Sequence, residues 1–289
     1  PVLQQAEFFD NYGRTVTDAF KGVCHYFDRI IRPEQLMTAC LNAMRVLTDP
    51  ADTGAVCLAM PQDVEGEAYD YPEHFLQKRV WHLDRRPISS SQLERATKLI
   101  KEAKKPIIVC GGGVRYSGAE NELLEFAEKY NIPIAEAQAG KGIIDWKNPL
   151  NVGGIGVTGG KAANVIGRDA DLVIGVGTRF SDFTTSSKWL FNENRKVLGI
   201  NVCPFDAYKM DAEAIVADAK EAVKALISSC EGYKSEYTNE IKEAKAEWDK
   251  IVDEYYSTEL EGGLNQTLAL GIINEFMAVS YTHLTLPTT

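Results

Sequence analysis

Short apolar runs alternate with amphipathic helical patterns through the middle of the chain, and this alternation constrains the fold more than any other feature. The apolar runs lie at 106–110, 133–137, 172–177 and 197–202, and each has the length and continuity of a strand buried on both faces. Strands that alternate with helices are joined by right-handed crossovers into a mainly parallel sheet. The predicted fold class is therefore α/β, with parallel-sheet three-layer domains.

Capping patterns predict where helices begin in this region. Ser91 and Glu94 have the spacing of a capping box, and Ser117 and Glu120 repeat it. We therefore expect one helix to start at each pair. Further predicted elements are helices at 161–166 and 219–228, a short strand at 215–217, and a long, mostly solvated helix over the Glu- and Lys-rich stretch 233–256.

The first part of the chain carries a second, shorter α/β pattern. Apolar residues recur at three and four over 33–47, which predicts an amphipathic helix, and the apolar run 55–60 predicts a buried strand. Residues 65–90 are polar and aromatic without periodicity, as expected of an inter-domain connection. The predicted segments are 1–75, a linker 76–90, a central α/β domain 91–232, a connecting helix with the start of a further domain 233–278, and a non-native tail 279–289.

Composition and charge exclude several classes of protein. The net charge of −10 and the pI near 5.0 argue against a nucleic-acid-binding surface. Because no run of 18 apolar residues occurs, neither a membrane span nor a signal peptide is predicted, and the expected location is cytoplasmic. The six cysteines lack the spacing of metal ligands, so they are predicted to be buried, reduced thiols and no metal site is predicted.

A glycine-rich segment matches a nucleotide-type motif. Gly154, Gly156 and Gly159 have GxGxxG spacing just before the helix predicted at 161–166. Backbone amides in such a loop, together with the helix N-terminus, could hold a phosphate. The strand that should precede the motif, 150–152, is weakly indicated, so a structural tight turn and a nucleotide site remain equal alternatives.

Two more stretches lie where predicted strands end, which is where α/β sheets bind ligands. One contains Gly111, Gly112 and Gly113, and the other contains Gly177 and Arg179. The Arg179 side chain could pair with a phosphate or with a surface carboxylate. With the GxGxxG glycines, these residues form a predicted nucleotide-like cavity. The chain shows no nucleophile and base pair, because its histidines are dispersed and it has no glycine-flanked serine elbow.

The detailed sequence resembles a family of thiamine-diphosphate-dependent enzymes. Its members, the 3D-(3,5/4)-trihydroxycyclohexane-1,2-dione hydrolases of myo-inositol catabolism, belong to the wider acetolactate-synthase-like superfamily. The resemblance runs from residue 1 to about 278. It is carried by RPEQLMTA (32–39), NAMRVLTDPA (42–51), AMPQDV (59–64), CGGGVRYS (110–117), QAGK (138–141), DLVIGVGTRF (171–180) and DFTT (182–185).

This resemblance implies a subunit of three domains, and the chain is expected to be a fragment of it. Residues 1–75 correspond to the last part of a pyrimidine-binding domain, 91–232 to the central domain, and 233–278 to the lead-in to a diphosphate-binding domain. The implied cofactors are thiamine diphosphate and Mg²⁺ in the full-length protein. The glutamate that promotes ylid formation and the metal-binding motif are expected to lie outside this chain, so the fragment alone is expected to be inactive.

The implied reaction is cleavage of a C–C bond in the cyclic dione, with water releasing 5-deoxyglucuronate and the cofactor acting as electron sink. The implied partners are that small-molecule substrate and further copies of the subunit, as a homodimer or homotetramer when full length. Nucleic acid and membrane are not expected partners.

Two departures from relatives bear on the site. Carboligases of the superfamily carry DAFQ with Phe and Gln facing the substrate, whereas this chain has Asp18, Ala19, Phe20 and Lys21. Phe20 and Lys21 are thus candidate active-site neighbours, with the start of a surface helix as the alternative. Flavin- or ADP-binding relatives carry two acidic residues at a strand end where this chain has Ile200-Asn201-Val202, which argues against a bound flavin and leaves a nucleotide-like cavity open.

Two other functions stay open on the sequence. The chain could belong to an acetolactate-synthase-like carboligase or decarboxylase, or it could be a non-catalytic nucleotide-binding module. The pattern over 33–63 argues against the module, because a stand-alone nucleotide domain would have no use for the end of a pyrimidine-binding domain.

Overall fold

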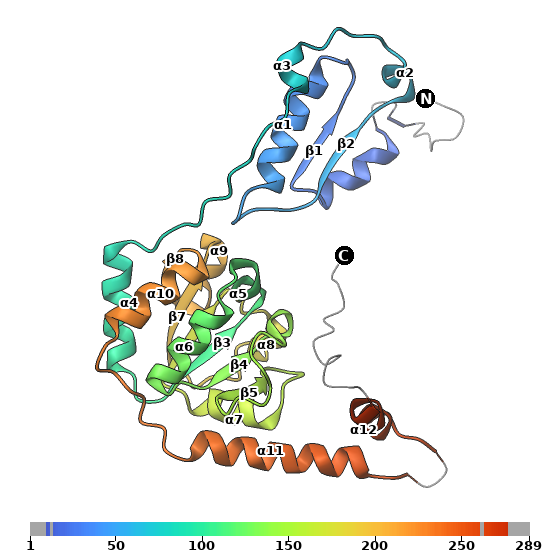
Figure 1. Cartoon of the computed structure of the whole chain (residues 1–289). Helices are drawn as coiled ribbons and strands as arrows, with labels where there is room; N and C mark the ends of the chain where they lie inside the picture. The colour runs from blue at the N-terminus through green and yellow to red at the C-terminus, as the bar shows by residue number, and fades with distance from the viewer. Residues whose placement is uncertain (1–9, 12–13, 261–262, 277–289) are drawn as a thin grey trace. The chain divides into compact units, whose positions relative to one another are not determined.

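The computed structural model describes residues 10–11, 14–260 and 263–276, and the chain divides into two compact units. The first ends at Asp84 and the second begins at Arg85 (Figure 1). This boundary lies within the segment 76–90 that the sequence assigns to a linker. The predicted tail 279–289 lies outside the described residues. No described helix has the length and apolar character needed to cross a membrane.

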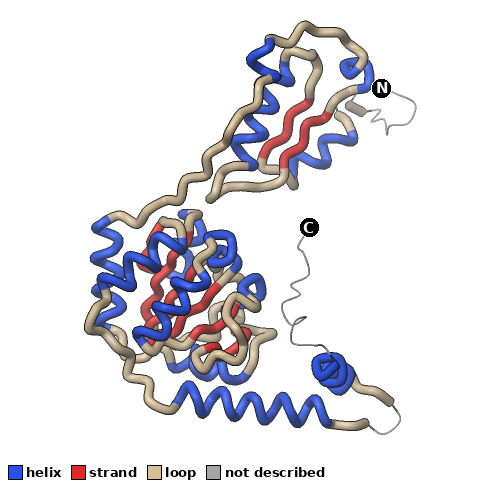
Figure 2. Tube along the Cα trace, viewed as in Figure 1, coloured by secondary structure: helices blue, strands red, loops and turns tan. Residues whose placement is uncertain are grey.

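A six-stranded, entirely parallel sheet forms the centre of the second unit (Figure 2). Its spatial order is β5-β4-β3-β6-β7-β8, so the chain starts in the middle, builds outward on one side and then returns to build the other. This is the order of doubly wound folds, and the strand order reverses between β3 and β6. The strands are β3 (Pro106–Cys110), β4 (Ile134–Glu136), β5 (Asn151–Gly154), β6 (Leu172–Val176), β7 (Lys196–Asn201) and β8 (Glu213–Val216).

Helices flank this sheet and cover its central strands. Every residue of β3 and β6 is buried, which explains their unbroken apolar sequences. Helix α10 packs on both α4 and α6, while α11 packs on α7. The helices are α4 (Ser90–Glu102), α5 (Gly112–Ser117), α6 (Glu120–Tyr130), α7 (Lys161–Asp169), α8 (Asp182–Thr185), α9 (Pro204–Ala207), α10 (Ala219–Ser229), α11 (Glu240–Ser257) and α12 (Gln266–Phe276), with short 3-10 turns at Gln138–Gly140 and Lys209–Asp211. The α/β class predicted from the sequence is confirmed.

The first unit is smaller and more open. Its sheet has two parallel strands, β1 (Tyr26–Arg29) and β2 (Val56–Ala59), packed with α1 (Gln35–Leu47). Every residue of both strands is only half-buried. Parallel strands are normally covered on both faces, so this sheet lacks much of the apolar burial that stabilises the second unit. The remaining elements are the 3-10 helix η1 (Val16–Gly22), α2 (Gln62–Glu65) and α3 (Glu73–Leu76).

Several predicted helix starts are wrong, and one weakly indicated strand is present. The first capping box of the central domain is made by Ser89 and Gln92, so α4 begins just before the predicted pair Ser91 and Glu94. Ser117 does not cap α6. It is the last residue of α5, a helix that was not predicted, and its hydroxyl donates to Asp218. The weakly indicated strand at 150–152 is a true strand, β5. The long helix α11 starts only at Glu240.

The cysteine prediction is correct in part. All six cysteines are free thiols. Cys110 and Cys230 are buried as predicted, and burial raises the pKa of both thiols. The other four, Cys24, Cys40, Cys57 and Cys203, are only half-buried.

The difference in burial between the units predicts a difference in stability. We expect amides of residues 26–59 to exchange hydrogen for deuterium faster than those of β3 and β6, because the half-buried β1–β2 pair opens at lower free energy. Hydrogen exchange read by mass spectrometry, with limited proteolysis alongside, measures this. Digestion that degraded the second unit while leaving the first intact would contradict the expectation.

Candidate functional site

The carboxyl edge of the second unit's sheet, at the point between β3 and β6, is the candidate site. It is built by the loops that follow these two strands, and the structure brings the predicted stretches 111–113 and 177–179 together there. The amide of Gly111 donates to the carbonyl of Val176 (2.9 Å), and the amide of Gly113 donates to the carbonyl of Gly177 (3.0 Å). In an open doubly wound sheet this position forms a crevice that binds ligands.

Here the two loops close on each other through their backbones. A Cβ placed on Gly113 would lie 2.6 Å from Cα of Gly177, and one placed on Gly177 would lie 2.6 Å from Cα of Gly113. Gly177 also has φ +60, in the left-handed region that favours glycine. These glycines therefore let two loop backbones touch, and the Gly111 and Gly113 amides that could face a phosphate are hydrogen-bonded within the protein.

The GxGxxG segment forms a tight turn between β5 and α7. Gly156 has φ +103, and a Cβ there would overlap the carbonyl oxygen of Phe183. The Gly156 amide donates to Oδ1 of Asn164 (2.9 Å), and the Gly159 amide donates to the Gly156 carbonyl (3.0 Å). The indole of Trp248 on α11 lies against Gly160, which precedes α7. The tight-turn alternative thus has direct contacts to support it, and phosphate binding at Gly154, Gly156 and Gly159 stays a prediction.

Arg179 is exposed at the same edge because the next residue turns inward. Phe180 has φ +45 and is 7 % exposed, with its ring against Gly175. The carbonyl of Arg179 accepts a hydrogen bond from Nζ of Lys209 (3.1 Å). Arg179 is therefore a surface residue that an anionic group could reach, while the Lys209 ammonium bonded to its carbonyl also pairs with Oδ1 of Asp206 (2.7 Å).

Two buried polar residues at this edge, Asn201 and Glu136, make loop contacts that the sequence did not predict. Asn201 ends β7 and is 9 % exposed; its Nδ2 donates to the carbonyl of Thr178 (3.1 Å), and its Oδ1 accepts from the Cys203 amide (3.0 Å). It occupies the strand end at which flavin-binding relatives carry acids, and here it ties two loops together. The signal that could have exposed it is a polar residue directly after the apolar run of β7.

Glu136 is the second. It ends β4, is 4 % exposed, and its Oε1 accepts from the Gly142 amide (3.1 Å) and from Nδ2 of Asn151 (3.4 Å). Burial raises the pKa of this carboxyl, while Lys141 and the bonded amides oppose the rise. A glutamate inside the predicted strand 133–137 was the available signal. Glu136 organises the loop that follows β4.

Phe20 and Lys21 lie in the first unit, on η1. Phe20 is 48 % exposed, and Nζ of Lys21 pairs with Oδ1 of Asp18 (2.8 Å) and lies 5.4 Å from the ring centroid of Phe27. Both side chains are accessible. They lie in the last turn of this exposed 3-10 helix, so the alternative of a surface helix start is wrong in position, and a substrate-facing role stays a prediction.

The recorded cavities lie away from these residues. One of about 620 Å³ is lined by residues at the amino edge of the sheet, including Lys101, Lys104 and Tyr233. Another of about 350 Å³ is lined by Arg195, Met210 and Glu213 among others. Neither contains any candidate residue. Within the described part of the chain, no group of three or more His, Cys, Asp or Glu side chains is placed to hold a metal ion.

Comparison with known proteins identifies the second unit. Residues 93–226 match the family model described as the central domain of thiamine pyrophosphate enzymes. The match covers the parallel sheet from β3 to β8. Residues 93–226 are therefore similar to the central domain of thiamine pyrophosphate enzymes.

The central domain and its surroundings match longer proteins throughout. The chain is 52 % identical to a protein of Clostridium tetani over 96 % of its own length, 53 % to one of Geobacillus thermodenitrificans over 93 %, and 50 % to one of Bacillus anthracis over 99 %. All three are named 3D-(3,5/4)-trihydroxycyclohexane-1,2-dione hydrolase. The alignments cover 47 %, 43 % and 45 % of those proteins, so the chain spans about half the length of the relatives it matches.

The backbone contact in the central domain predicts an unequal response of two glycines. Gly177 (φ +60) and Gly118 (φ +64) share the same backbone strain, but a Cβ at Gly118 meets nothing within 4 Å. Gly177→Ala should therefore destabilise the domain by about 1–3 kcal/mol more than Gly118→Ala, because only the former overlaps packed backbone. Urea unfolding of both variants measures the difference, and equal losses would contradict the contact.

Burial of Glu136 predicts a pH-dependent stability difference. Its folded-state pKa is raised above the ordinary value of 4.5, so the folded state binds the proton more tightly than the unfolded state. As pH rises from about 4.5 through the folded pKa, the wild type should lose stability relative to Glu136→Gln, which cannot ionise. Urea unfolding from pH 4.5 to 8 tests this against Glu125→Gln on the exposed face of α6, where no such trend is expected. A pH-independent difference for Glu136→Gln would refute the assignment.

Proposed function

We propose that this chain serves a thiamine-diphosphate-dependent enzyme that hydrolyses a carbon–carbon bond of 3D-(3,5/4)-trihydroxycyclohexane-1,2-dione. The observation that carries the proposal is the 50–53 % identity to proteins of that name over nearly the whole chain. Because the identity extends beyond the central domain into the first unit, it supports this enzyme over an isolated nucleotide-binding module. We further propose a cytoplasmic enzyme that acts as a homodimer or homotetramer and uses Mg²⁺.

The described residues do not fit the cofactor's diphosphate and metal. Mg²⁺ beside a diphosphate is usually held by one or two carboxylates together with the phosphates. Among the described residues, no group of three or more His, Cys, Asp or Glu side chains is placed to hold a metal ion. The glycine amides at 111, 113, 156 and 159 donate within the protein. We infer that the central domain serves as a scaffold, and that the groups holding thiamine diphosphate lie outside the described part of the chain.

We propose that this chain supports and positions the other parts of the enzyme. The buried strands β3 and β6 and the contact between Gly113 and Gly177 make the central domain a rigid body. Such a body can serve as the framework to which other domains of the enzyme attach. In the first unit, we propose the exposed Phe20 and Lys21 as neighbours of the substrate.

A nucleotide-like ligand at the carboxyl edge is the second candidate. It is favoured by the strand order, which reverses between β3 and β6, and by the exposed residue Arg179 in the loop that follows β6. The hydrogen-bonded glycine amides weigh against it.

A chimera tests the proposed function. In the Clostridium tetani relative, the matched segment would be replaced by residues 10–276, and ring opening would be assayed with thiamine diphosphate and Mg²⁺. Because the chain is 52 % identical to the segment it replaces, we expect activity within about tenfold of the parent, which corresponds to about 1.4 kcal/mol in the barrier.

The matched control is a chimera that carries the equivalent segment of a 2-oxoacid carboligase, which should not open the ring. Thermal unfolding would establish that both chimeras fold. A folded chimera that decarboxylates 2-oxoacids and leaves the dione intact would move the assignment to the carboligases. An inactive chimera, combined with saturable ADP binding by this chain, would move it to the nucleotide-binding module.

A further inference from the structure

The segment between the two units changes character at Arg85. Residues 77–89 form no helix or strand, and residues 76–87 are exposed. Up to Asp84 the segment belongs to the first unit, and from Arg85 it belongs to the second. An exposed segment without secondary structure has few contacts that restrict its backbone. The mobile part of this segment therefore ends at the first residue that is hydrogen-bonded to the second unit.

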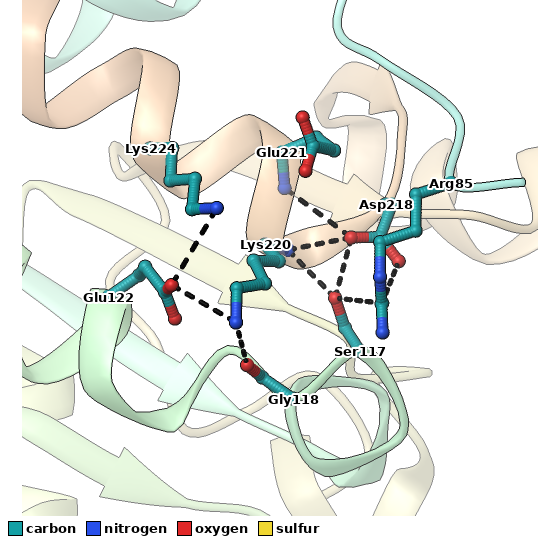
Figure 3. Close-up of polar contacts among 8 residues, drawn as sticks. All are labelled: Arg85, Ser117, Gly118, Glu122, Asp218, Lys220, Glu221 and Lys224. Carbon is teal, nitrogen blue, oxygen red and sulfur yellow. Dashed lines mark hydrogen bonds and ion pairs between the residues drawn. The ribbon is translucent and has the colours of Figure 1, made fainter.

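Arg85 makes that contact through its side chain. Its Nη1 donates to Oδ2 of Asp218 (2.9 Å) and to Oγ of Ser117 (3.1 Å), as Figure 3 shows. The Asp218 side chain is 13 % exposed and Ser117 is 4 % exposed, so the guanidinium group binds a largely buried pair. Charge-assisted hydrogen bonds to a partly desolvated carboxylate are stronger than those of an open surface ion pair.

The two acceptors of Arg85 are held in place by hydrogen bonds that do not involve Arg85. Asp218 is the N-cap of α10, where its Oδ1 accepts from the amides of Lys220 (3.0 Å) and Glu221 (3.4 Å). Ser117 ends α5, donates to Oδ1 of Asp218 (2.6 Å) and accepts from the Lys220 amide (2.8 Å). This arrangement uses one carboxylate oxygen for the helix cap and leaves the other for Arg85 (Figure 3).

The backbone adds a second attachment one residue later. The amide of Asp218 donates to the carbonyl of Arg86 (2.9 Å). As an N-cap residue, Asp218 has no acceptor for this amide within its own helix. Protection of the Asp218 amide from hydrogen exchange therefore depends on its hydrogen bond to Arg86, and measures whether the connecting segment is bound to the second unit.

We propose that Arg85, Asp218 and Ser117 form a latch that ends the freely moving part of the inter-unit connection. Residues 77–84 are then the tether, which at about 3.3–3.6 Å per residue spans at most about 29 Å. Opening the latch adds length to the tether and lowers the effective concentration of one unit at the other. The latch thus sets the reach of the first unit.

Hydrogen exchange with residue-level fragmentation tests the latch in the intact chain. In Arg85→Gln, the Asp218 amide should exchange about tenfold faster, which corresponds to about 1.4 kcal/mol of lost protection. The amides of Lys220 and Glu221 should keep their protection, because Asp218 still caps α10. Chymotryptic cleavage after Leu83 should rise in the same variant.

Arg79→Gln is the matched control, since it removes the same charge from the tether and should change none of these rates. Unchanged exchange at Asp218 in Arg85→Gln would overturn the proposal. So would an equal rise at Asp218, Lys220 and Glu221, because that pattern would mean that Arg85 supports α10 itself. An equal rise in Asp218 exchange in Arg79→Gln would also overturn the proposal, because it would mean that loss of any positive charge in the segment has this effect.

Discussion

The contact between the loops that follow β3 and β6 is the constraint on which the rest of the central domain depends. These strands are neighbours at the centre of the sheet, and they are the point from which the chain builds outward in both directions. Gly113 and Gly177 bring the two loop backbones together at a distance that no side chain would permit. The same contact lies where the strand order reverses, the position at which a doubly wound sheet can bind a ligand.

The groups that the described residues offer to a cofactor bear on what the domain does. Thiamine-dependent chemistry needs a held diphosphate and metal. The glycine amides at 111, 113, 156 and 159 donate within the protein, and the described residues include no group of three or more His, Cys, Asp or Glu placed to hold a metal ion. Glu136 and Asn201 illustrate this use, since each is a buried polar residue at a strand end that organises a loop. A rigid central body attached to a half-buried first unit is consistent with a role in holding other parts of an enzyme in place.

Much of this fold could be predicted from the sequence, because a short continuous apolar run is typical of a strand that is buried on both faces of a parallel sheet. The runs at 106–110 and 172–177 correspond to β3 and β6 within one residue. The boundaries that failed depend on tertiary contacts. Ser117 has the right spacing for a capping box, but its hydroxyl is held by Asp218, a residue far away in the sequence. Similarly, β5 is short and rich in glycine, and pairing with β4 makes it a strand.

The candidate site was harder to predict. Glycine spacing identified the loops that meet at the carboxyl edge, because close approach and ligand binding both favour glycine. Spacing alone could not distinguish these two uses, since the answer lies in which carbonyl each amide faces. The sequence likewise gave no indication that Arg85, in an irregular segment, would bond Asp218 and Ser117.

The central claim is that the described residues form a scaffold and do not hold the cofactor. Calorimetric titration of this chain with thiamine diphosphate in the presence of Mg²⁺ tests it most directly. The account predicts no saturable heat of binding with the cofactor at about 1 mM, a concentration at which even an affinity of about −4.1 kcal/mol would register. Saturable binding that Arg179→Ala abolishes would contradict it, because the carboxyl edge would then be a cofactor site.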